Sequence, residues 1–368
     1  MEKTKIGVVG CGDISGIYLT NLTTKFKNTQ IVGLYDLIEE KAEKAATQYG
    51  IPKKYKDMHE LFNDPNVEIV LNLTRPYQHH AVSMAAIKAG KHVYSEKPMG
   101  ASLEEAVEIK EEAEKKGVLV GGAPDTFLGA GQQTCRKLVD SGFIGKPIGA
   151  TAFFACPGHE RWHPDPDFYY QFGGGPLFDM GPYYITALVN LLGPVKTVSG
   201  MGQKTSATRT ITAARKFGET IDVNVDTHIA ATLSFECGAI CTMMMSFDVH
   251  AHNLPILEVY GTEGTLSVPD PNTFDGPVRL FRREQQEFLN VPLTFGYKEN
   301  SRGLGASDMA LAIKSGRKPR AGIDLYFHVF EIMAGIQESA LQKKEVEIAS
   351  RTQKPEPMHT GLLPGTVK

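Results

Sequence analysis

The feature that most constrains the fold lies near the start of the chain, where a short apolar run leads directly into a glycine-rich turn. Residues 6–15 read IGVVGCGDIS, and a helical pattern then continues to about Lys25. This strand-turn-helix context makes the G-x-G-x-x-S spacing informative. Free N–H groups at the helix N-terminus favour an anion, and a glycine lets a phosphate approach the backbone. The residues expected to contact a dinucleotide here are Gly10, Gly12, Asp13, Ile14 and Ser15.

Strand and helix patterns alternate through the first third of the chain. Such alternation implies right-handed crossovers and a parallel sheet covered by helices. We therefore predict an α/β Rossmann domain over residues 1–122. After the first strand, further strands are expected at Gln30–Tyr35, Ile69–Leu73, His92–Ser95 and Val118–Val120, and helices at Ile38–Tyr49, Ala81–Ala89 and Leu103–Lys116.

The pattern changes after residue 122. A chain of 368 residues exceeds the usual size of a single core, so a second domain is expected. We predict an α+β domain over residues 123–368, with a large, mostly antiparallel open sheet. Its expected strands are 149–155, Asp226–Phe235, Ala239–Phe247, Ile256–Tyr260 and Gly264–Val268, and its expected helices are Gly131–Ser141, Asp179–Leu192, Ser307–Ser315 and Leu325–Leu341. The Pro-rich tail from Gln353 is expected to wrap the surface.

Composition excludes several classes of partner. The formal net charge of -3 gives no electrostatic reason to expect nucleic acid or an anionic membrane as a partner. No window of about 18 apolar residues is present, so no membrane span is predicted. The five cysteines are an odd number and follow no secretory signal, which favours free thiols in a reducing cytoplasm. Cys237 and Cys241 lack a completing pair, so we expect no metal.

The second predicted strand ends at Asp36, 24 residues after Gly12. An acid at this point can accept both hydroxyls of the adenosine ribose. It would also repel a 2′-phosphate, and the following Leu37 and Ile38 offer no basic group to bind one. NAD is therefore favoured over NADP. The alternative is that Asp36 only caps the helix that follows.

The fourth predicted strand ends in the segment GKHVYSEKP, which contains Glu96 and Lys97. The carboxyl end of a strand in an open parallel sheet faces the ligand crevice, which places Lys97 beside the nicotinamide. With the glycine loop, the Thr74…Pro76…His79 stretch and the segment GGGPLFDMGPYY, this sequence resembles the Gfo/Idh/MocA family of sugar and cyclitol oxidoreductases. The resemblance spans residues 5 to about 195.

The resemblance implies roles for particular side chains. The lysine that matches Lys97 orients the substrate and stabilises charge on its oxygen, and the second motif supplies Asp179 and Tyr183 as catalytic residues. Many relatives carry His where this chain has Tyr183, which leaves the identity of the acid/base open. The same comparison places further cofactor contacts at Thr74, Pro76, His79, Glu96 and Lys97. Arg75 lies where relatives usually carry Pro, and its role is open.

The argument for Tyr183 from physical chemistry is electrostatic. Hydride transfer from an alcohol requires that its hydroxyl proton leave, and a tyrosine pKa of about 10 is too high for a base at neutral pH. A nearby ammonium such as that of Lys97 is expected to lower this pKa. Asp179 lies four residues earlier and shares a helix face with Tyr183. The structural alternatives are an interface-packing role for Tyr183 and a helix N-cap for Asp179.

The segment 157–175 is dense in His, Asp, Pro and aromatic residues and is predicted to be a loop. Aromatic faces can stack on sugar rings, while His and Asp bond to hydroxyls. We therefore expect His159, Trp162 and His163 to bind substrate together with Lys97, Asp179 and Tyr183. His163 is the second candidate for the acid/base.

Together these features predict a cytoplasmic, NAD-dependent dehydrogenase acting on a secondary alcohol of a sugar, a sugar derivative or a cyclitol. The alternatives are an NADPH-dependent reductase of a keto-sugar and a non-catalytic NAD sensor. The strand-rich half shows no second layer of helices for one sheet face, so a homodimer or homotetramer joined sheet to sheet is expected. Ala239–Phe247, with Met243, Met244 and Met245, is the strand expected to supply that face.

Overall fold

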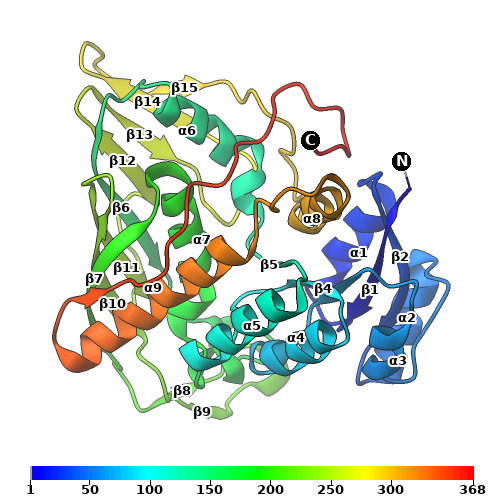
Figure 1. Ribbon diagram of the computed structural model, residues 1–368. Coiled ribbons are helices and arrows are strands. Elements are labelled where there is room, and N and C mark those ends of the chain that lie inside the picture. Colours follow the sequence, from blue (N-terminus) through cyan, green and yellow to red (C-terminus); the bar gives the residue numbers. More distant parts are fainter. Residues whose placement is uncertain (1) are drawn as a thin grey trace.

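The computed structural model describes residues 2–368, in which the chain forms two large sheets of different kinds (Figure 1). The first has five parallel strands in the order β2-β1-β3-β4-β5, which confirms the predicted parallel sheet. Its strands are β1 (Thr4–Val9), β2 (Thr29–Tyr35), β3 (Ile69–Asn72), β4 (His92–Ser95) and β5 (Val120–Gly122), and its helices are α1 (Ser15–Thr24), α2 (Glu39–Tyr49), α3 (Met58–Asn63), α4 (His79–Lys88) and α5 (Leu103–Lys116).

Local chemistry explains where these helices begin and end. The Ser102 side chain accepts from the Glu105 N–H to cap α5, and Gly117 ends it in the left-handed region with φ of 65°. Helix α4 begins two residues before the expected Ala81, because a short 3-10 turn at Pro76–Gln78 leads directly into it. Helix α3 was not predicted, since its six residues are too few for a helical period to be recognised.

The second sheet has nine strands in the order β15-β14-β13-β12-β6-β11-β10-β7-β16. All neighbours in it are antiparallel except β6 and β11, which run parallel, so the prediction of a mostly antiparallel sheet is confirmed. The strands are β6 (Pro147–Ala155), β7 (Val195–Gln203), β10 (His228–Phe235), β11 (Ile240–Ser246), β12 (Leu257–Gly261), β13 (Gly264–Val268), β14 (Val278–Arg282), β15 (Leu289–Val291) and β16 (Val346–Glu347).

Helices cover one face of this second sheet. Figure 1 shows α6 (Ala130–Asp140), α7 (Gly175–Leu192) and α9 (Ile323–Gln342) on the same side of the strands. The opposite face is more exposed: in β10, Ile229 and Leu233 are buried, whereas Ala230 and Thr232 between them are exposed. Helix α8 (Leu304–Ser315) instead packs against β4 and β5 of the first sheet.

The methionine triplet does not form the outward face that the sequence suggested. Met243 and Met245 are buried in the core under the helices, and only Met244 points to the opposite face. Side chains alternate across a strand, so three consecutive residues cannot share one face. Any sheet-to-sheet contact would therefore use Met244 rather than all three.

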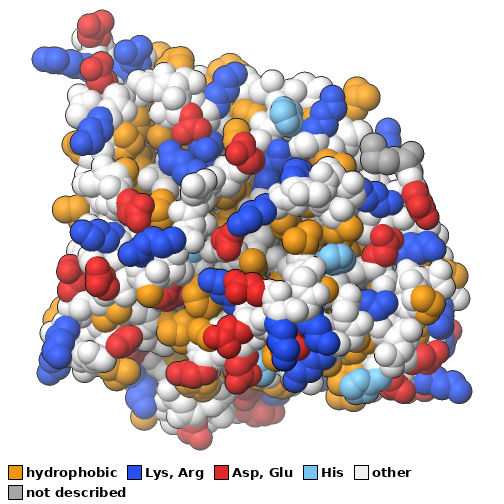
Figure 2. All heavy atoms as spheres, viewed as in Figure 1, with side chains coloured by type: hydrophobic (Ala, Val, Ile, Leu, Met, Phe, Trp, Pro, Cys, Tyr) orange, Lys and Arg blue, Asp and Glu red, His pale blue; other side chains and the backbone are white. Residues whose placement is uncertain are grey.

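Two smaller features complete the fold. Strands β8 (Thr208–Thr210) and β9 (Thr220–Asp222) form a separate two-stranded hairpin. After α8 the chain returns to the first sheet, where the Gly122 N–H donates to the Ala321 carbonyl at 3.1 Å. The predicted domain boundary at residue 122 thus falls at the end of β5 and stays a prediction. On the face seen in Figure 2, acidic and basic side chains are interspersed.

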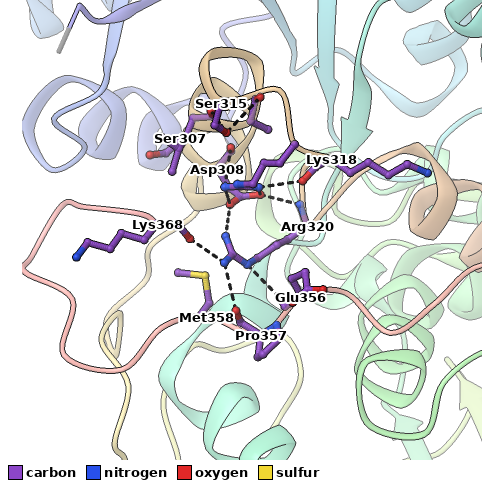
Figure 3. A network of polar contacts seen from close by, with 12 residues as sticks. Ser307, Asp308, Ser315, Lys318, Arg320, Glu356, Pro357, Met358 and Lys368 are labelled. Atoms are coloured by element: carbon purple, nitrogen blue, oxygen red, sulfur yellow. Dashed lines mark hydrogen bonds and ion pairs between the residues drawn. The ribbon is translucent and has the colours of Figure 1, made fainter.

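A buried ion pair anchors the C-terminal tail (Figure 3). The Arg320 guanidinium donates to Asp308 Oδ1 at 2.6 Å and to the carbonyl oxygens of Glu356, Pro357 and Lys368. The Asp308 side chain is completely buried. The tail therefore does more than wrap the surface, because its backbone completes the bonding of a buried cation.

Candidate active site

A cavity of about 740 Å³ lies between the carboxyl ends of the first sheet's strands and the loop 157–174. Side chains from both parts of the chain line it. Those from the first 122 residues include Ile14, Thr74, Pro76, His79, Glu96 and Lys97, and those from the rest include His159, Trp162, Phe172, Asp179, Tyr183 and Arg302.

The glycine loop has the geometry of a phosphate-binding turn. Gly10 has a φ of 100°, and a Cβ added there would lie 2.7 Å from the Leu73 backbone, so only glycine fits. A Cβ on Gly12 would meet no atom within 4 Å, which leaves that side of the loop open to a ligand. The Ser15 hydroxyl donates to the Gly12 carbonyl at 2.6 Å and steadies the turn at the start of α1.

Asp36 is tied to this loop. Its carboxylate accepts from the Cys11 N–H at 2.6 Å and from the Ile38 N–H at 2.8 Å. The residue that caps α2 is Ile38, so Asp36 lies outside the helix that it was alternatively expected to cap. The partly exposed carboxylate retains further acceptor positions, and the open side of Gly12 lies on the same loop. These residues fit the ribose and pyrophosphate of a dinucleotide.

His79 and Glu96 support the loops that follow β3 and β4. The His79 ring is buried, with Nδ1 2.7 Å from the Pro98 carbonyl oxygen and Nε2 2.9 Å from that of Thr74. Burial lowers the pKa of this ring. The Glu96 carboxylate accepts from the Tyr18 hydroxyl at 2.7 Å and from the Lys97 N–H at 3.1 Å. Both side chains hold these loops in place and also line the cavity.

Lys97, Asp179 and His159 form a continuous chain of hydrogen bonds. Lys97 Nζ donates to the Asp179 carbonyl at 2.6 Å and to Asp179 Oδ1 at 2.8 Å. The other carboxylate oxygen, Oδ2, lies 2.9 Å from His159 Nε2, while Trp162 Nε1 donates to His159 Nδ1 at 3.2 Å. Since Nδ1 accepts from Trp162, Nε2 carries the proton and donates to Asp179.

Opposite charge sets the ionisation of this pair. Burial alone would lower the pKa of Lys97, but the Asp179 carboxylate raises it above its ordinary value. Burial alone would raise the pKa of Asp179, yet Lys97 and His159 hold it well below its ordinary value. Lys97 is therefore an ammonium and Asp179 a carboxylate over the whole neutral range.

Tyr183 lies beside Lys97 on helix α7, and the ammonium nitrogen is 5.3 Å from the ring centroid. Lys97 acts on the pKa of the phenol in the expected direction, but burial outweighs its effect. Burial raises this pKa above its ordinary value of 10, and the nearby cations Lys97 and Arg302 offset only part of the increase. The phenol is consequently protonated at neutral pH.

Arg302 is a site residue that the sequence did not indicate. It precedes α8 and is held by Asn272 Oδ1 at 2.5 Å and by Asn300 Oδ1 at 3.0 Å, with its guanidinium facing Tyr183. Asn272 also lines the cavity. Neither residue belongs to a recognisable motif, since both come from loops that only the folded chain brings to the site.

His163 lies differently from His159. Its Nδ1 accepts from the Asp165 N–H at 3.0 Å, and its ring packs against Trp162, Phe168 and Tyr169. It is absent from the described residues that line the cavity. The geometry thus gives His159, rather than His163, direct contact with the Lys97–Asp179 pair.

Ion pairs fasten the loop 157–174 to its surroundings. Asp165 accepts from Arg75 and from Lys216, each at 2.7 Å, and Lys216 also bonds Asp167 at 2.7 Å. Arg75, whose role was open, therefore links the loop after β3 to the loop over the cavity. Among residues 2–368, no group of three or more His, Cys, Asp or Glu side chains is placed to hold a metal ion.

Profiles of one protein family match two stretches of the chain. Residues 4–122 match the profile described as an oxidoreductase family with an NAD-binding Rossmann fold, and residues 132–267 match the GFO/IDH/MocA C-terminal domain. The two matches together include β1 to β5 and most of the second sheet.

Curated relatives match the chain over shorter segments. The inositol 2-dehydrogenase/D-chiro-inositol 3-dehydrogenase of Lactiplantibacillus plantarum is 36% identical over 148 residues, 39% of this chain and 42% of that protein. The myo-inositol 2-dehydrogenase of Thermotoga maritima is 31% identical over 176 residues, 48% of this chain and 51% of that protein. The matched segment thus spans about half the length of these curated relatives or less.

A solved structure extends the likeness to nearly the whole chain. Levoglucosan dehydrogenase, in a complex with NADH and L-sorbose, superposes with a TM-score of 0.81 and 22% sequence identity, covering 95% of this chain and 100% of that one. At this identity the likeness establishes the fold, including both sheets.

Proposed function

The chain belongs to the Gfo/Idh/MocA oxidoreductase family, and from this premise we propose that it is an NAD-dependent dehydrogenase of a sugar, a sugar derivative or a cyclitol. The observation that carries the proposal is the buried cluster of Lys97, Asp179 and Tyr183 beside a glycine loop open to phosphate. The names of the inositol dehydrogenases and of the levoglucosan dehydrogenase support this substrate class. A non-catalytic sensor would have no use for a buried ammonium aimed into the cavity.

The cofactor proposal rests on the first sheet. Gly10, Gly12, Asp13, Ile14 and Ser15 would hold the pyrophosphate, and Asp36 would accept the ribose hydroxyls, which favours NAD over NADP. Bound nicotinamide would supply the hydride acceptor. Thr74, Pro76, His79, Glu96 and Lys97 would border its ring.

Bonding capacity indicates what Lys97 does. An ammonium has three N–H donors, and the two contacts with Asp179 use two of them. The third can be directed at the substrate oxygen. Asp179 and His159 then act as the support that keeps the ammonium charged and in place, and Lys97 stabilises negative charge on the reacting oxygen.

Tyr183 is proposed as the acid/base. In the direction of ketone reduction, the protonated phenol donates its proton to the developing alkoxide. In the direction of alcohol oxidation, the phenolate must accept the hydroxyl proton. Because burial raises the phenol pKa, the phenolate is scarce at neutral pH, and oxidation should accelerate as the pH rises. This asymmetry favours reduction of a keto-sugar at neutral pH as the second candidate function.

Turnover of a panel of sugars, inositols and their ketones with NAD or NADH tests the proposal. We expect activity with at least one member of the panel and a preference for NAD over NADP. The matched control is Lys97→Ala, which should retain cofactor binding, measured by fluorescence titration, while losing turnover. Cofactor binding without turnover on any member of the panel would instead support the sensor.

Two further proposals concern the whole protein. The exposed face of the second sheet, opposite α6, α7 and α9, would join copies into a homodimer or homotetramer. Sedimentation at micromolar concentration tests this, and a monomer would contradict it.

All five cysteines are free thiols, which supports a reducing compartment such as the cytoplasm. No helix within residues 2–368 is long and apolar enough to cross a membrane.

A further inference from the structure

The cavity has an inner and an outer part that differ in exposure. The inner part contains Lys97, Asp179, His159 and Tyr183, and His159 and Tyr183 are each only 8% exposed. These four side chains bring an ammonium, a carboxylate, an imidazole and a phenol to the inner part of the cavity. That set is sufficient to bind and orient a single sugar ring through its hydroxyls.

The outer part is formed by aromatic side chains that remain largely exposed. Trp162 is 62% exposed and Phe172 is 73% exposed, although both line the same cavity. Large apolar side chains exposed next to a cavity commonly mark a ligand-binding surface. We call Trp162 and Phe172 the aromatic rim.

The rim adjoins the reaction centre. The Trp162 indole donates to His159 Nδ1, and the two ring centroids are 5.3 Å apart. His159 in turn contacts Asp179. A group attached to a sugar held at Lys97 and Asp179 would therefore meet Trp162 next, one side chain further out.

Charged side chains accompany the rim. Arg75 and Asp167 also line the cavity, and their side chains are about half exposed, at 48% and 47%. Each is ion-paired, which orders it without consuming all of its hydrogen-bonding capacity. Aromatic faces with a guanidinium and a carboxylate beside them match a sugar ring, which has apolar C–H faces and a hydroxyl edge. A plain aryl group would leave the charged groups unused.

The bound dinucleotide does not account for the rim. The residues that would hold the dinucleotide belong to the glycine loop and to the ends of β2, β3 and β4, whereas Trp162 and Phe172 lie on the loop 157–174 of the second part of the chain. That loop meets the first part of the chain through the Arg75–Asp165 ion pair and where Gly173 lies against Ala101.

From these observations we infer that the substrate is a glycoside of two sugar rings, with one ring in the inner part and the second stacked on the aromatic rim. This inference rests on the proposed function. The reaction removes a hydride from a ring carbon and a proton from its hydroxyl, giving a keto-sugar, reduced cofactor and a proton. The glycosidic bond between the two rings is unchanged.

The chain's only tryptophan lies on this rim, so binding can be followed without turnover. Titration of the protein with disaccharides, and with the methyl glycosides of the same sugars, should quench or shift the Trp162 fluorescence. We expect at least one disaccharide to bind about tenfold more tightly than its methyl glycoside. Equal binding of every such pair would overturn the inference, whether or not the protein turns sugars over.

Two variants sharpen the test. Phe172→Ala removes a rim face without touching the inner part, and it should weaken disaccharide binding several-fold while leaving the methyl glycoside unchanged. Phe217→Ala is the matched control, because Phe217 is 74% exposed but lies on the β8–β9 hairpin outside the cavity lining. A loss that is equal for both ligands in Phe172→Ala, or a loss of NAD affinity instead, would contradict a second sugar subsite.

Where turnover is found, the same pairs of ligands give kcat/KM. The disaccharide should have the higher value, through KM, and Phe172→Ala should abolish the difference. Turnover of single-ring sugars with no preference for two rings would overturn this inference and leave the proposed function intact. Tight disaccharide binding without any oxidation would overturn the proposed function and leave the rim as a sugar-binding surface.

Discussion

Two buried ion pairs lie in different regions of this molecule, and they differ in how completely their donors are used. At the C-terminal tail, the Arg320 side chain makes four hydrogen bonds, one to Asp308 and three to backbone carbonyls (Figure 3). In the cavity, Lys97 directs two of its three donors at Asp179 and keeps one. A cation whose donors are mostly used can only hold structure, whereas one with a free donor can bind a substrate.

The largest effect on folding is expected at the tail. Arg320→Met would remove one of the two guanidinium groups that donate to the completely buried Asp308 carboxylate, the other being that of Arg317, and would free three tail carbonyls. Breaking a buried pair costs about 3–5 kcal/mol of unfolding free energy, and because Arg317 still donates to Asp308, we expect a loss near the lower end of that range. Urea unfolding measures this loss. The double variant Arg320→Met/Asp308→Leu should recover part of it, and turnover at low temperature should stay near wild type. A loss below about 1 kcal/mol would mean that the pair is not what anchors the tail.

The largest effect on chemistry is expected at the other pair. Lys97→Ala should lower kcat by about 10²–10³, because it removes the charge that stabilises the reacting oxygen. Its unfolding free energy should fall less than that of Arg320→Met, since Asp179 is 14% exposed and keeps His159 as a donor, whereas Arg320→Met also removes the donor of three tail carbonyls. Steady-state kinetics and urea unfolding on the same preparations make the comparison. If the two variants lost stability equally and Lys97→Ala kept its turnover, the distinction between the two pairs would fail.

The contrast also shows what sequence could and could not predict. The glycine loop, Asp36 and the segment around Lys97 lie within short contiguous motifs at strand ends, where local sequence and the parallel sheet together determine position. They were predicted. Arg302 and Asn272 were missed, because they reach the cavity from loops without any pattern, more than 170 residues after Lys97.

The second limit on what the sequence could predict was the electrostatics of the site. The sequence indicated that Lys97 lies near Tyr183, but it could not indicate how deeply the phenol is buried, and burial reverses the expected direction of the pKa shift. Likewise, the sequence favoured His163, rather than His159, as the second candidate for the acid/base. Only the fold shows that His159 faces Asp179 and that His163 packs among aromatic rings.

The raised phenol pKa leads to a prediction about pH. Tyr183→Phe should lower the rate of ketone reduction by about 10², the low end for general acid catalysis, because Lys97 still polarises the oxygen. In the wild type, both pKa values lie above their ordinary ranges, so the acidic forms are lost only as the pH rises beyond about 10. The rate of reduction should therefore be flat between about pH 6 and 9. An inflection near pH 6.5 that Tyr183→Phe preserves would point to a histidine.

A smaller effect, on cofactor preference, is expected from changing Asp36, at the end of the cofactor cleft far from Lys97. Asp36→Arg replaces the carboxylate that would accept the ribose hydroxyls with a cation suited to a 2′-phosphate, so the ratio of NAD to NADP affinity should fall by at least about tenfold. Fluorescence titration with both reduced cofactors measures it. The Cys11 N–H also loses its acceptor, so Asp36→Asn serves as a control that keeps an oxygen there. An unchanged ratio in Asp36→Arg would leave Asp36 with only a structural role.

The smallest effect is expected where the ion pairs are exposed. Arg75, Asp165 and Lys216 form a network at the surface with side chains 28–48% exposed, and such pairs contribute about 0.2–1 kcal/mol each. Arg75→Gln should therefore leave stability nearly unchanged. Its effect should be on the loop 157–174, which loses one of its links to the first part of the chain, so the KM for sugar should rise a few-fold while kcat changes little.

Salt and pH distinguish this network from the buried pairs. Screening at 1 M salt, where the Debye length is about 3 Å, should raise the KM of the wild type to that of Arg75→Gln. Lys216 and Arg75 lower the pKa of Asp165 to about 2, so the stabilisation that the network provides is present above about pH 4 and is lost as the pH falls through about 2. Lys318→Gln is a matched control, because Lys318 forms an exposed pair with Asp324 at the same distance of 2.7 Å but far from the loop. If Lys318→Gln raised KM as much as Arg75→Gln, the change would reflect surface charge in general rather than a link across the cavity.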